Sequence, residues 1–140
     1  MRKAGFSLPE VVVTLAMMAV LLSIALPRFM ALRDATSVHA AAGDLASAFS
    51  LARQVAVSRH RVVGIVLDTA RGVVEVRSGG ARIVRRQLAA SYGVHLGSNR
   101  DSAVFDARGL GYGLSNLSVA IQRGHFVDTL TMSRLGRVRW

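Results

Sequence analysis

The residues most capable of chemistry stand late in the sequence, in Gly136-Arg137-Val138-Arg139-Trp140. In an extended segment, alternate side chains point the same way, so Arg137 and Arg139 share one side and Val138 takes the other. Two guanidinium groups a short distance apart suit neighbouring phosphates. Arg134 and Trp140 flank the pair, and an indole can stack on a base. The pattern predicts nucleic-acid contact. The alternative is a last strand whose Val138 is core and whose arginines are only solvated.

A second basic group consists of Arg82, Arg85 and Arg86 in a strand-like segment. On a regular strand, Arg82 and Arg86 share one face, and Arg85 lies on the other, so the three do not form one flat patch. We expect a solvated strand face. It would still add to a nonspecific electrostatic footprint.

The charge balance favours a polyanionic partner. The formal net charge is +10, and from Arg61 onward the chain has 12 arginines against five acidic residues. Such an excess suits nucleic acid or an anionic membrane surface. Lys3 is the only lysine, so codon bias can explain arginine over lysine, although not basic over acidic. The chain has no cysteine, which excludes disulfides and thiolate chemistry.

No pattern in the sequence predicts an enzyme, a metal site, a cofactor or a small-molecule substrate. The glycines of Gly109-Leu110-Gly111-Tyr112-Gly113 fail the dinucleotide-binding pattern, because Leu114 stands where the third glycine belongs. That segment predicts a flexible loop. The four histidines are far apart and lack metal-ligand spacing: His39, His60, His95 and His125.

A long helix must position these residues. Apolar residues recur at three- and four-residue spacing after an apolar run, which predicts one helix from Phe6 to about Ser58, about 80 Å long. Pro27 lies inside it and permits a kink. On its wetter face, Asp34 and Asp44 are expected only to be solvated.

After Arg61 the pattern changes to that of strands. Strands are predicted at 62–67, 73–77 and 81–88 as an antiparallel meander, with shorter ones at 93–96, 103–105, 117–121 and 129–133. Asp101 and Asp106 fall in turn-like segments, where aspartate forms local hydrogen bonds. The predicted fold class is α+β, a long N-terminal helix packed on a small antiparallel β-sheet head.

The first half of the predicted helix can cross a membrane. From Phe6 to Leu26 the 21 residues are apolar or carry a small hydroxyl, except Glu10, and at ~1.5 Å per residue they span ~30 Å of hydrocarbon. A carboxylate there costs roughly 2.5–3.5 kcal/mol, so Glu10 should have a partner. An ordinary secretory signal ending near Ser23-Ile24-Ala25, or a plain anchor, would leave Glu10 unexplained.

Gly5-Phe6-Ser7-Leu8-Pro9-Glu10 before an apolar helix resembles the class III signal of type IV pilins and of type II secretion pseudopilins. The resemblance implies that a prepilin peptidase cleaves after Gly5 and methylates Phe6. It implies that Glu10 neutralises the terminal amine of a neighbouring pilin subunit during assembly. It also implies a single-pass protein of the bacterial inner membrane with a periplasmic head, found in the pilus fibre after assembly.

The segments expected from this resemblance are a leader peptide at 1–5, a transmembrane and assembly half-helix at 6–27 and an amphipathic half-helix at 28–60. A β-rich globular head with a basic C-terminal tail follows at 61–140.

Phe105-Asp106-Ala107-Arg108-Gly109 and Gly136-Arg137-Val138-Arg139 resemble the GspH/FimT branch of the superfamily. In FimT-type minor pilins a Gly-Arg-x-Arg motif is associated with DNA binding during uptake. The resemblance therefore implies a minor pilin that binds double-stranded DNA for natural transformation through Gly136, Arg137 and Arg139. The rival is a GspH-type minor pseudopilin of a type II secretion system, structural and without DNA binding. The chain departs from many pilins in lacking a disulfide-bounded C-terminal loop.

Overall fold

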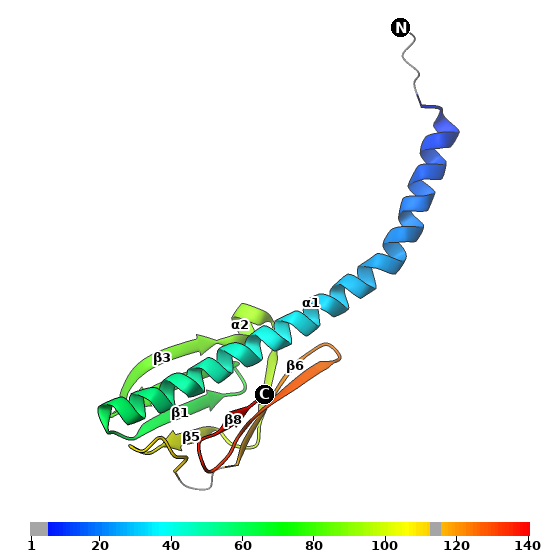
Figure 1. The fold of residues 1–140 in the computed structure, drawn as a ribbon. Helices are drawn as coiled ribbons and strands as arrows, with labels where there is room; N and C mark the ends of the chain where they lie inside the picture. Colours follow the sequence, from blue (N-terminus) through cyan, green and yellow to red (C-terminus); the bar gives the residue numbers. More distant parts are fainter. Residues whose placement is uncertain (1–5, 113–115) are drawn as a thin grey trace. The chain divides into compact units, whose positions relative to one another are not determined.

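The computed structural model describes residues 6–112 and 116–140, so the predicted leader lies outside the described residues. The chain divides into two units, one ending at Arg33 and one spanning Asp34–Trp140. Helix α1 (Leu8–Arg59) contributes residues to both (Figure 1). The prediction of one long helix is confirmed, with Pro27 inside it.

In the first unit, every described side chain up to Arg33 is exposed. By length and composition, α1 is long and apolar enough here to span a membrane. The hydroxyls of Thr14 and Ser23 donate to helix carbonyls at 2.8 and 2.7 Å. In a lipid environment, neither hydroxyl would therefore be an unsatisfied polar group.

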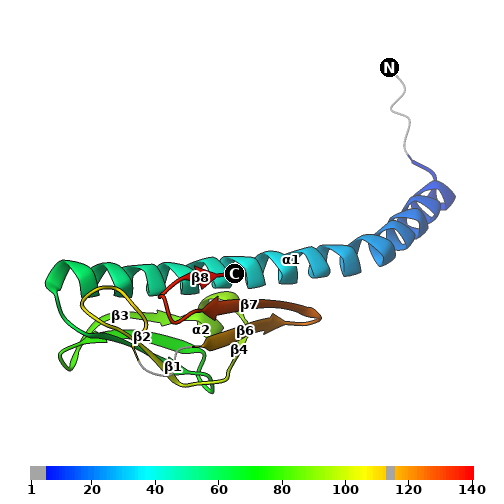
Figure 2. The same cartoon turned by 60° about the horizontal axis from the view of Figure 1, so that its bottom comes forward.

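The second unit places the rest of α1 along two antiparallel four-stranded sheets (Figure 2). The first has the order β3-β2-β1-β5 and consists of β1 (Val63–Asp68), β2 (Val73–Ser78), β3 (Ala81–Gln87) and β5 (Ser102–Phe105). The second has the order β4-β6-β7-β8 and consists of β4 (His95–Ser98), β6 (Leu117–Arg123), β7 (Phe126–Met132) and β8 (Val138–Arg139).

One core joins α1 to both sheets. The buried stripe of α1 recurs at helical spacing and is mostly alanine, which leaves room for the large residues of the strands. Phe49 of α1 and Phe105 of β5 are the largest fully buried side chains. Full burial of such a side chain contributes about 1.5–3 kcal/mol. The predicted α+β class is therefore confirmed, although the sequence did not predict two sheets.

Some elements of the head differ from the predictions. The third strand ends at Gln87, and α2 (Leu88–Tyr92) follows, stopped by Gly93 with a left-handed φ of 65°. Leu88 turns into the core as part of this helix. β6 and β7 are longer than predicted because Gly124, with a φ of 58°, closes them into one hairpin.

The predicted faces of β3 are wrong. The register shifts so that Arg77 pairs with Arg82 while Val76 pairs with Val84, leaving Ile83 as an extra residue. Such a bulge reverses the alternation of side chains. Arg82 and Arg85 consequently lie together, with side chains 3.4 and 3.7 Å from the Glu75 carboxylate.

The expectation that the acids of α1 are only solvated is also wrong. Arg86, on the other face of β3, lies 3.3 Å from the carboxylate of Asp44. Asp34 accepts a hydrogen bond from Arg123. Both acids therefore tie α1 to the sheets.

Candidate nucleic-acid interface

A tight turn from Ser133 to Arg137 leads into β8. The N–H of Ser133 donates to the carbonyl of Arg137, and the N–H of Gly136 donates to that of Ser133, both at 2.9 Å. Gly136 has a φ of 69°, and a Cβ there would lie 2.5 Å from the carbonyl oxygen of Gly109. Only glycine suits this backbone. The glycine of the Gly-Arg-x-Arg motif thus shapes the turn that delivers the two arginines.

β8 presents its side chains alternately, as predicted. Val138 pairs with Met132 and Arg139 with Thr131, antiparallel to β7. Arg137 and Arg139 are exposed, whereas Val138 is half-buried against the core. This burial pattern is expected both for DNA contact and for a last strand with solvated arginines. The surroundings of the arginines must therefore distinguish the two interpretations.

Arg137 and Arg139 line the same surface hollow, of about 530 Å³. β6, β7 and β8 contribute to it, together with the turn before β8. Its wall also carries four polar side chains able to donate hydrogen bonds: Asn116, Ser118, Thr131 and Ser133. Such groups hold phosphate oxygens beside arginine in protein–DNA interfaces. The hollow therefore combines two guanidinium groups with neutral hydrogen-bond donors, the groups that bind a DNA backbone phosphate.

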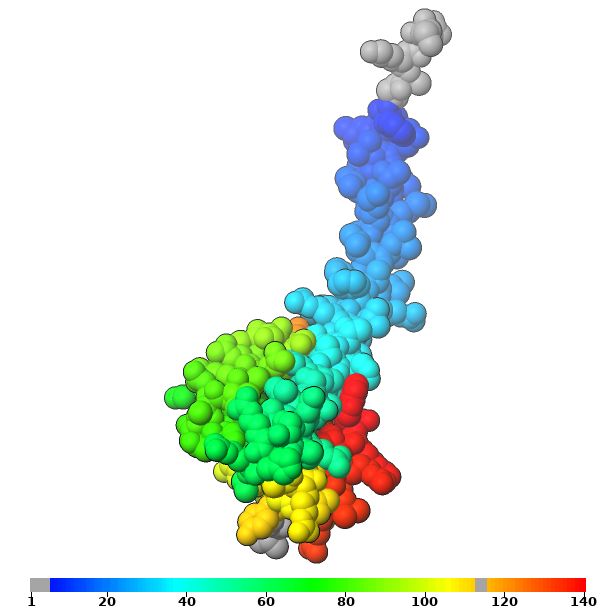
Figure 3. Space-filling model, turned by 60° about the vertical axis from the view of Figure 1, so that its left-hand side comes forward, coloured from blue at the N-terminus to red at the C-terminus, as the bar shows by residue number. Residues whose placement is uncertain are grey.

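Three arginines of the C-terminal segment form no ion pair with any residue in the described ranges 6–112 and 116–140. They are Arg134, Arg137 and Arg139. All three are exposed, and the C-terminal segment stands at the surface of the head, red in Figure 3. The arginines of β3 are instead paired with acids. The C-terminal arginines are therefore free of acidic partners within the described residues and available to an anionic ligand, whereas the charges of the β3 arginines are already partly neutralised.

Trp140 packs on α1. Its ring centroid lies 4.9 Å from that of His39, with the planes inclined by 45°. A Cβ built on Gly43 would lie 3.6 Å from the Cη2 atom of Trp140, an ordinary contact distance. The residue Trp140 as a whole is 51% exposed. One side of the ring is thus occupied by the helix, and the other is open.

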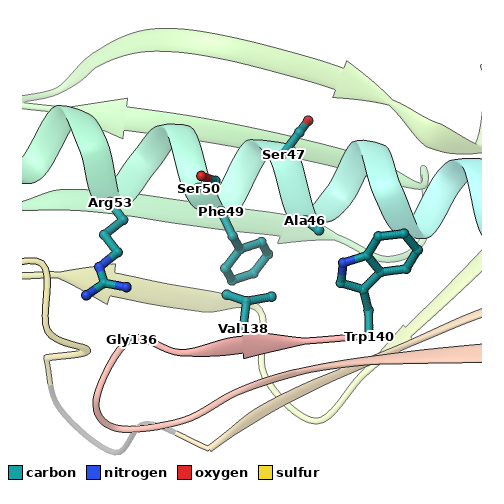
Figure 4. A pocket seen from close by; sticks show the side chains of 8 residues that line it. All are labelled: Ala46, Ser47, Phe49, Ser50, Arg53, Gly136, Val138 and Trp140. Atoms are coloured by element: carbon teal, nitrogen blue, oxygen red, sulfur yellow. The ribbon is translucent and has the colours of Figure 1, made fainter.

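The same side of α1 holds a second hollow, of about 400 Å³, between the helix and β8. Figure 4 shows Val138 pointing toward Phe49 from one wall, with Arg53 and Trp140 at the two ends. The C-terminal segment is therefore fastened to α1 through Val138 and Trp140, while Arg137 and Arg139 line the hollow described above.

The loop after β5 supports the turn from beneath. Oδ1 of Asp106 accepts the backbone N–H groups of Arg108 and Leu110 at 2.9 and 2.8 Å, which confirms the predicted local hydrogen bonding. The N–H of Gly111 donates to the carbonyl of Arg134 at 3.1 Å. Residues 109–112 thus form a hydrogen-bonded loop, whose predicted flexibility stays a prediction, and Gly113 of the predicted segment lies outside the described residues.

The polar wall of the hollow, which includes Ser118 and Thr131, was not predicted from the sequence. A signal existed for Thr131, because Thr129 and Thr131 alternate with apolar residues along a predicted strand. The pairing of Thr131 with Arg139 depends on the register of β7 and β8, which no local pattern specifies.

At the other end of the chain, Glu10 lies in the first turn of α1, where the helix dipole favours a carboxylate. No hydrogen-bond or ion-pair partner is recorded for its side chain among the residues that the structure describes. The partner that the sequence predicts for the Glu10 carboxylate is therefore not found within the described part of one chain.

Comparison with known proteins gives two family matches. A model described as "Type II transport protein GspH" matches residues 41–136, and one described as "Prokaryotic N-terminal methylation motif" matches residues 1–26. Arg137 and Arg139 lie just beyond the first match. A search of curated proteins found no significant match.

Two crystal forms of the type IV minor pilin FimU from Pseudomonas aeruginosa PAO1 resemble the fold. The first is 19% identical with a TM-score of 0.64, covering 74% of this chain and 87% of FimU. The second is 18% identical with a TM-score of 0.60, covering 72% and 90%. At these identities the likeness concerns the fold.

Proposed function

We propose that this chain, which belongs to the GspH family of type II transport proteins, is a minor pilin that binds double-stranded DNA through Arg137 and Arg139. The structural role of a pilin or pseudopilin subunit follows from the family matches and the pilin-like fold. DNA binding in natural transformation is the step that we add.

The observation that carries the proposal is the hollow beside β8. Two exposed arginines line it, and neither has an ion-pair partner among the described residues. A guanidinium binds a phosphate through two parallel N–H donors, and hydroxyls on the same wall can complete the contact. Arg134, in the preceding turn, adds a third unpaired charge. Such a site contacts the DNA backbone, so binding should depend on salt and only weakly on sequence.

Trp140 enters the proposal as an anchor. Its contact with His39 holds the end of the strand on α1, next to Arg139. A duplex keeps its bases stacked inside, so a backbone-binding site needs no aromatic platform. The open side of the indole then lies beside the duplex rather than between bases.

Assembly forms the other half of the proposal. We propose cleavage after Gly5, methylation of Phe6, and pairing of Glu10 with the new amine of a neighbouring subunit. An unpaired charge at the centre of a membrane-spanning helix costs roughly 2.5–3.5 kcal/mol, and pairing would offset the part of that cost that falls on Glu10. The head would face the periplasm before assembly and the outside of the fibre afterwards. The partners are other pilin subunits, the prepilin peptidase, the inner membrane and DNA.

A second candidate is a minor pseudopilin of a type II secretion system that binds no DNA. The description of the family model that matches residues 41–136 favours it. Both candidates share the anchor, the processing and the fold. They differ in what Arg137 and Arg139 do.

The test is DNA binding by the full mature chain in a non-ionic detergent, measured by the anisotropy of a labelled duplex over a range of salt. Replacing both arginines (R137A/R139A) should remove two phosphate contacts, lowering the affinity about tenfold or more and the salt slope by about 1.8. The matched control is R82A/R85A, which removes two arginines that already share Glu75. Equal affinities for the wild type and R137A/R139A would reject the DNA role and favour the pseudopilin.

A further inference from the structure

The end of α1 is closed by a hydrogen-bonded cap that fixes two arginines. The N–H of Arg61 donates to the carbonyl of Ala56 at 3.2 Å, and that of His60 donates to Val57 at 3.4 Å. His60 has a left-handed φ of 50°. These are the two bonds of a Schellman motif with a residue in the left-handed region at its centre. The cap therefore fixes the backbone positions of Arg59, the last residue of α1, and of Arg61, on either side of His60.

A hairpin turn faces this cap. Gly79 and Gly80 have φ values of 56° and 83°, as the two central residues of a type I′ turn between β2 and β3 require. The hydroxyl of Ser78 donates to the carbonyl of Val62 at 3.4 Å, which joins the turn to the chain leaving the cap. The arginines and the turn together line a hollow of about 530 Å³.

The hollow is basic and accessible to a ligand. Arg59 and Arg61 are exposed, and no ion pair is recorded for either within the described part of the chain. Nothing lies within 4 Å of a Cβ built on Gly79 or Gly80, so a ligand can approach the turn backbone closely. Backbone N–H groups in turns of this kind contribute to anion-binding concavities. The remaining lining residues are neutral: Ser78, Ala81 and Ile83.

We propose that this cap hollow, defined by Arg59, Arg61 and Gly79 of the β2–β3 turn, is a second phosphodiester-binding site. Its ligand is the backbone of the DNA that the C-terminal hollow binds, so the inference rests on the proposed function. The two hollows belong to the same unit and share no lining residue. The site adds phosphate contacts without reading bases, and so raises affinity and salt dependence for every sequence alike.

A purely structural role for these arginines is the competing explanation. Cations at the C-terminus of a helix interact favourably with its dipole, so Arg59 and Arg61 can stabilise α1 without a ligand. Such a role would appear in the thermal midpoint and leave DNA affinity unchanged. The two roles therefore require separate readouts on the same variants.

The experiment uses the full mature chain in a non-ionic detergent with a labelled duplex, over a range of salt. R59A/R61A should lose about tenfold in affinity and about 1.8 in the salt slope, as expected for two lost phosphate contacts. R59K/R61K, which keeps the charges, should retain the slope. R100A/R108A removes two other exposed arginines and controls for net charge. Thermal unfolding of each variant is measured in parallel.

The outcomes separate this inference from the proposed function. If R59A/R61A matches R100A/R108A in affinity and slope, the cap hollow is not a phosphate site, whatever R137A/R139A does. If R137A/R139A binds like the wild type while R59A/R61A loses affinity, the cap hollow stands and the C-terminal assignment fails. In a background of R137A/R139A, adding R59A/R61A should lower the remaining affinity by about a further tenfold and the salt slope by about a further 1.8. No further loss in either quantity would overturn the proposal.

Discussion

Arg123 donates a hydrogen bond from Nε to Oδ1 of Asp34 at 2.7 Å, joining the end of β6 to α1 where the head begins. Its Nη1 also donates to the hydroxyl of Ser37, at 3.3 Å, and to the carbonyl of Tyr92. The side chains of Arg123 and Asp34 are only 23% and 29% exposed. Two segments far apart in the sequence are thus held by one guanidinium.

Removing that guanidinium should destabilise the head. R123A leaves Asp34 half-buried without its partner and the carbonyl of Tyr92 without its donor, so the free energy of unfolding should fall by about 2 kcal/mol. The matched control is R71A, whose exposed pair with Asp68 should contribute less than about 1 kcal/mol. Denaturant unfolding followed by circular dichroism measures both. Equal losses in the two variants would show that the Arg123 network contributes nothing special.

Gly136 should tolerate no side chain. G136A forces a left-handed φ on alanine and places its Cβ against the carbonyl of Gly109, so we expect a loss of stability of about 1–3 kcal/mol. Because the turn delivers Arg137 and Arg139, DNA affinity should fall with it. G79A is the matched control for stability, since Gly79 shares the positive φ and has open space around it. If G136A costs no more than G79A, the close approach to Gly109 does not matter.

The single tryptophan makes the anchor directly observable. Trp140 is the only one in the chain, so its fluorescence reports the contact with His39. H39A should move the emission to longer wavelength, because the indole gains water where the imidazole was. Adding duplex DNA to the wild type should leave the emission nearly unchanged. Strong quenching by DNA would instead assign Trp140 to base stacking.

Glu10 is expected to matter for assembly and not for folding of the head. E10L removes the carboxylate from an exposed apolar helix, so cleavage after Gly5 should continue while entry into the fibre is lost. The mass of the mature terminus and immunoblots of sheared fibres measure the two steps. T14V is the matched control, because the hydroxyl of Thr14 is already bonded to its own helix. Normal incorporation of E10L would contradict the pairing of Glu10 with a neighbouring amine.

The elements governed by local periodicity were predictable from the sequence. The spacing of apolar residues gave α1 to within two residues at each end, and Ser78-Gly79-Gly80 gave the β2–β3 turn. The alternation around Val138 placed Arg137 and Arg139 on one side correctly. Each of these depends on residues close together in the chain.

Features that depend on register or on distant contacts were not predictable. The extra residue Ile83 reverses the faces of β3, and nothing in its neighbours marks a bulge. Trp140 and His39 are in contact although almost the whole sequence of the head lies between them, and the same holds for Arg123 and Asp34. Long-range pairing of this kind is decided by the packing of the sheets on α1 and not by local sequence preference.

The fastening of β8 has a mechanical consequence for a fibre subunit. Load applied to the guanidinium of Arg139 reaches the backbone at a residue paired with Thr131, between the half-buried Val138 and the docked Trp140. If the proposed DNA contact forms, tension on the bound DNA would therefore be transmitted through β8 to a four-stranded sheet and to α1.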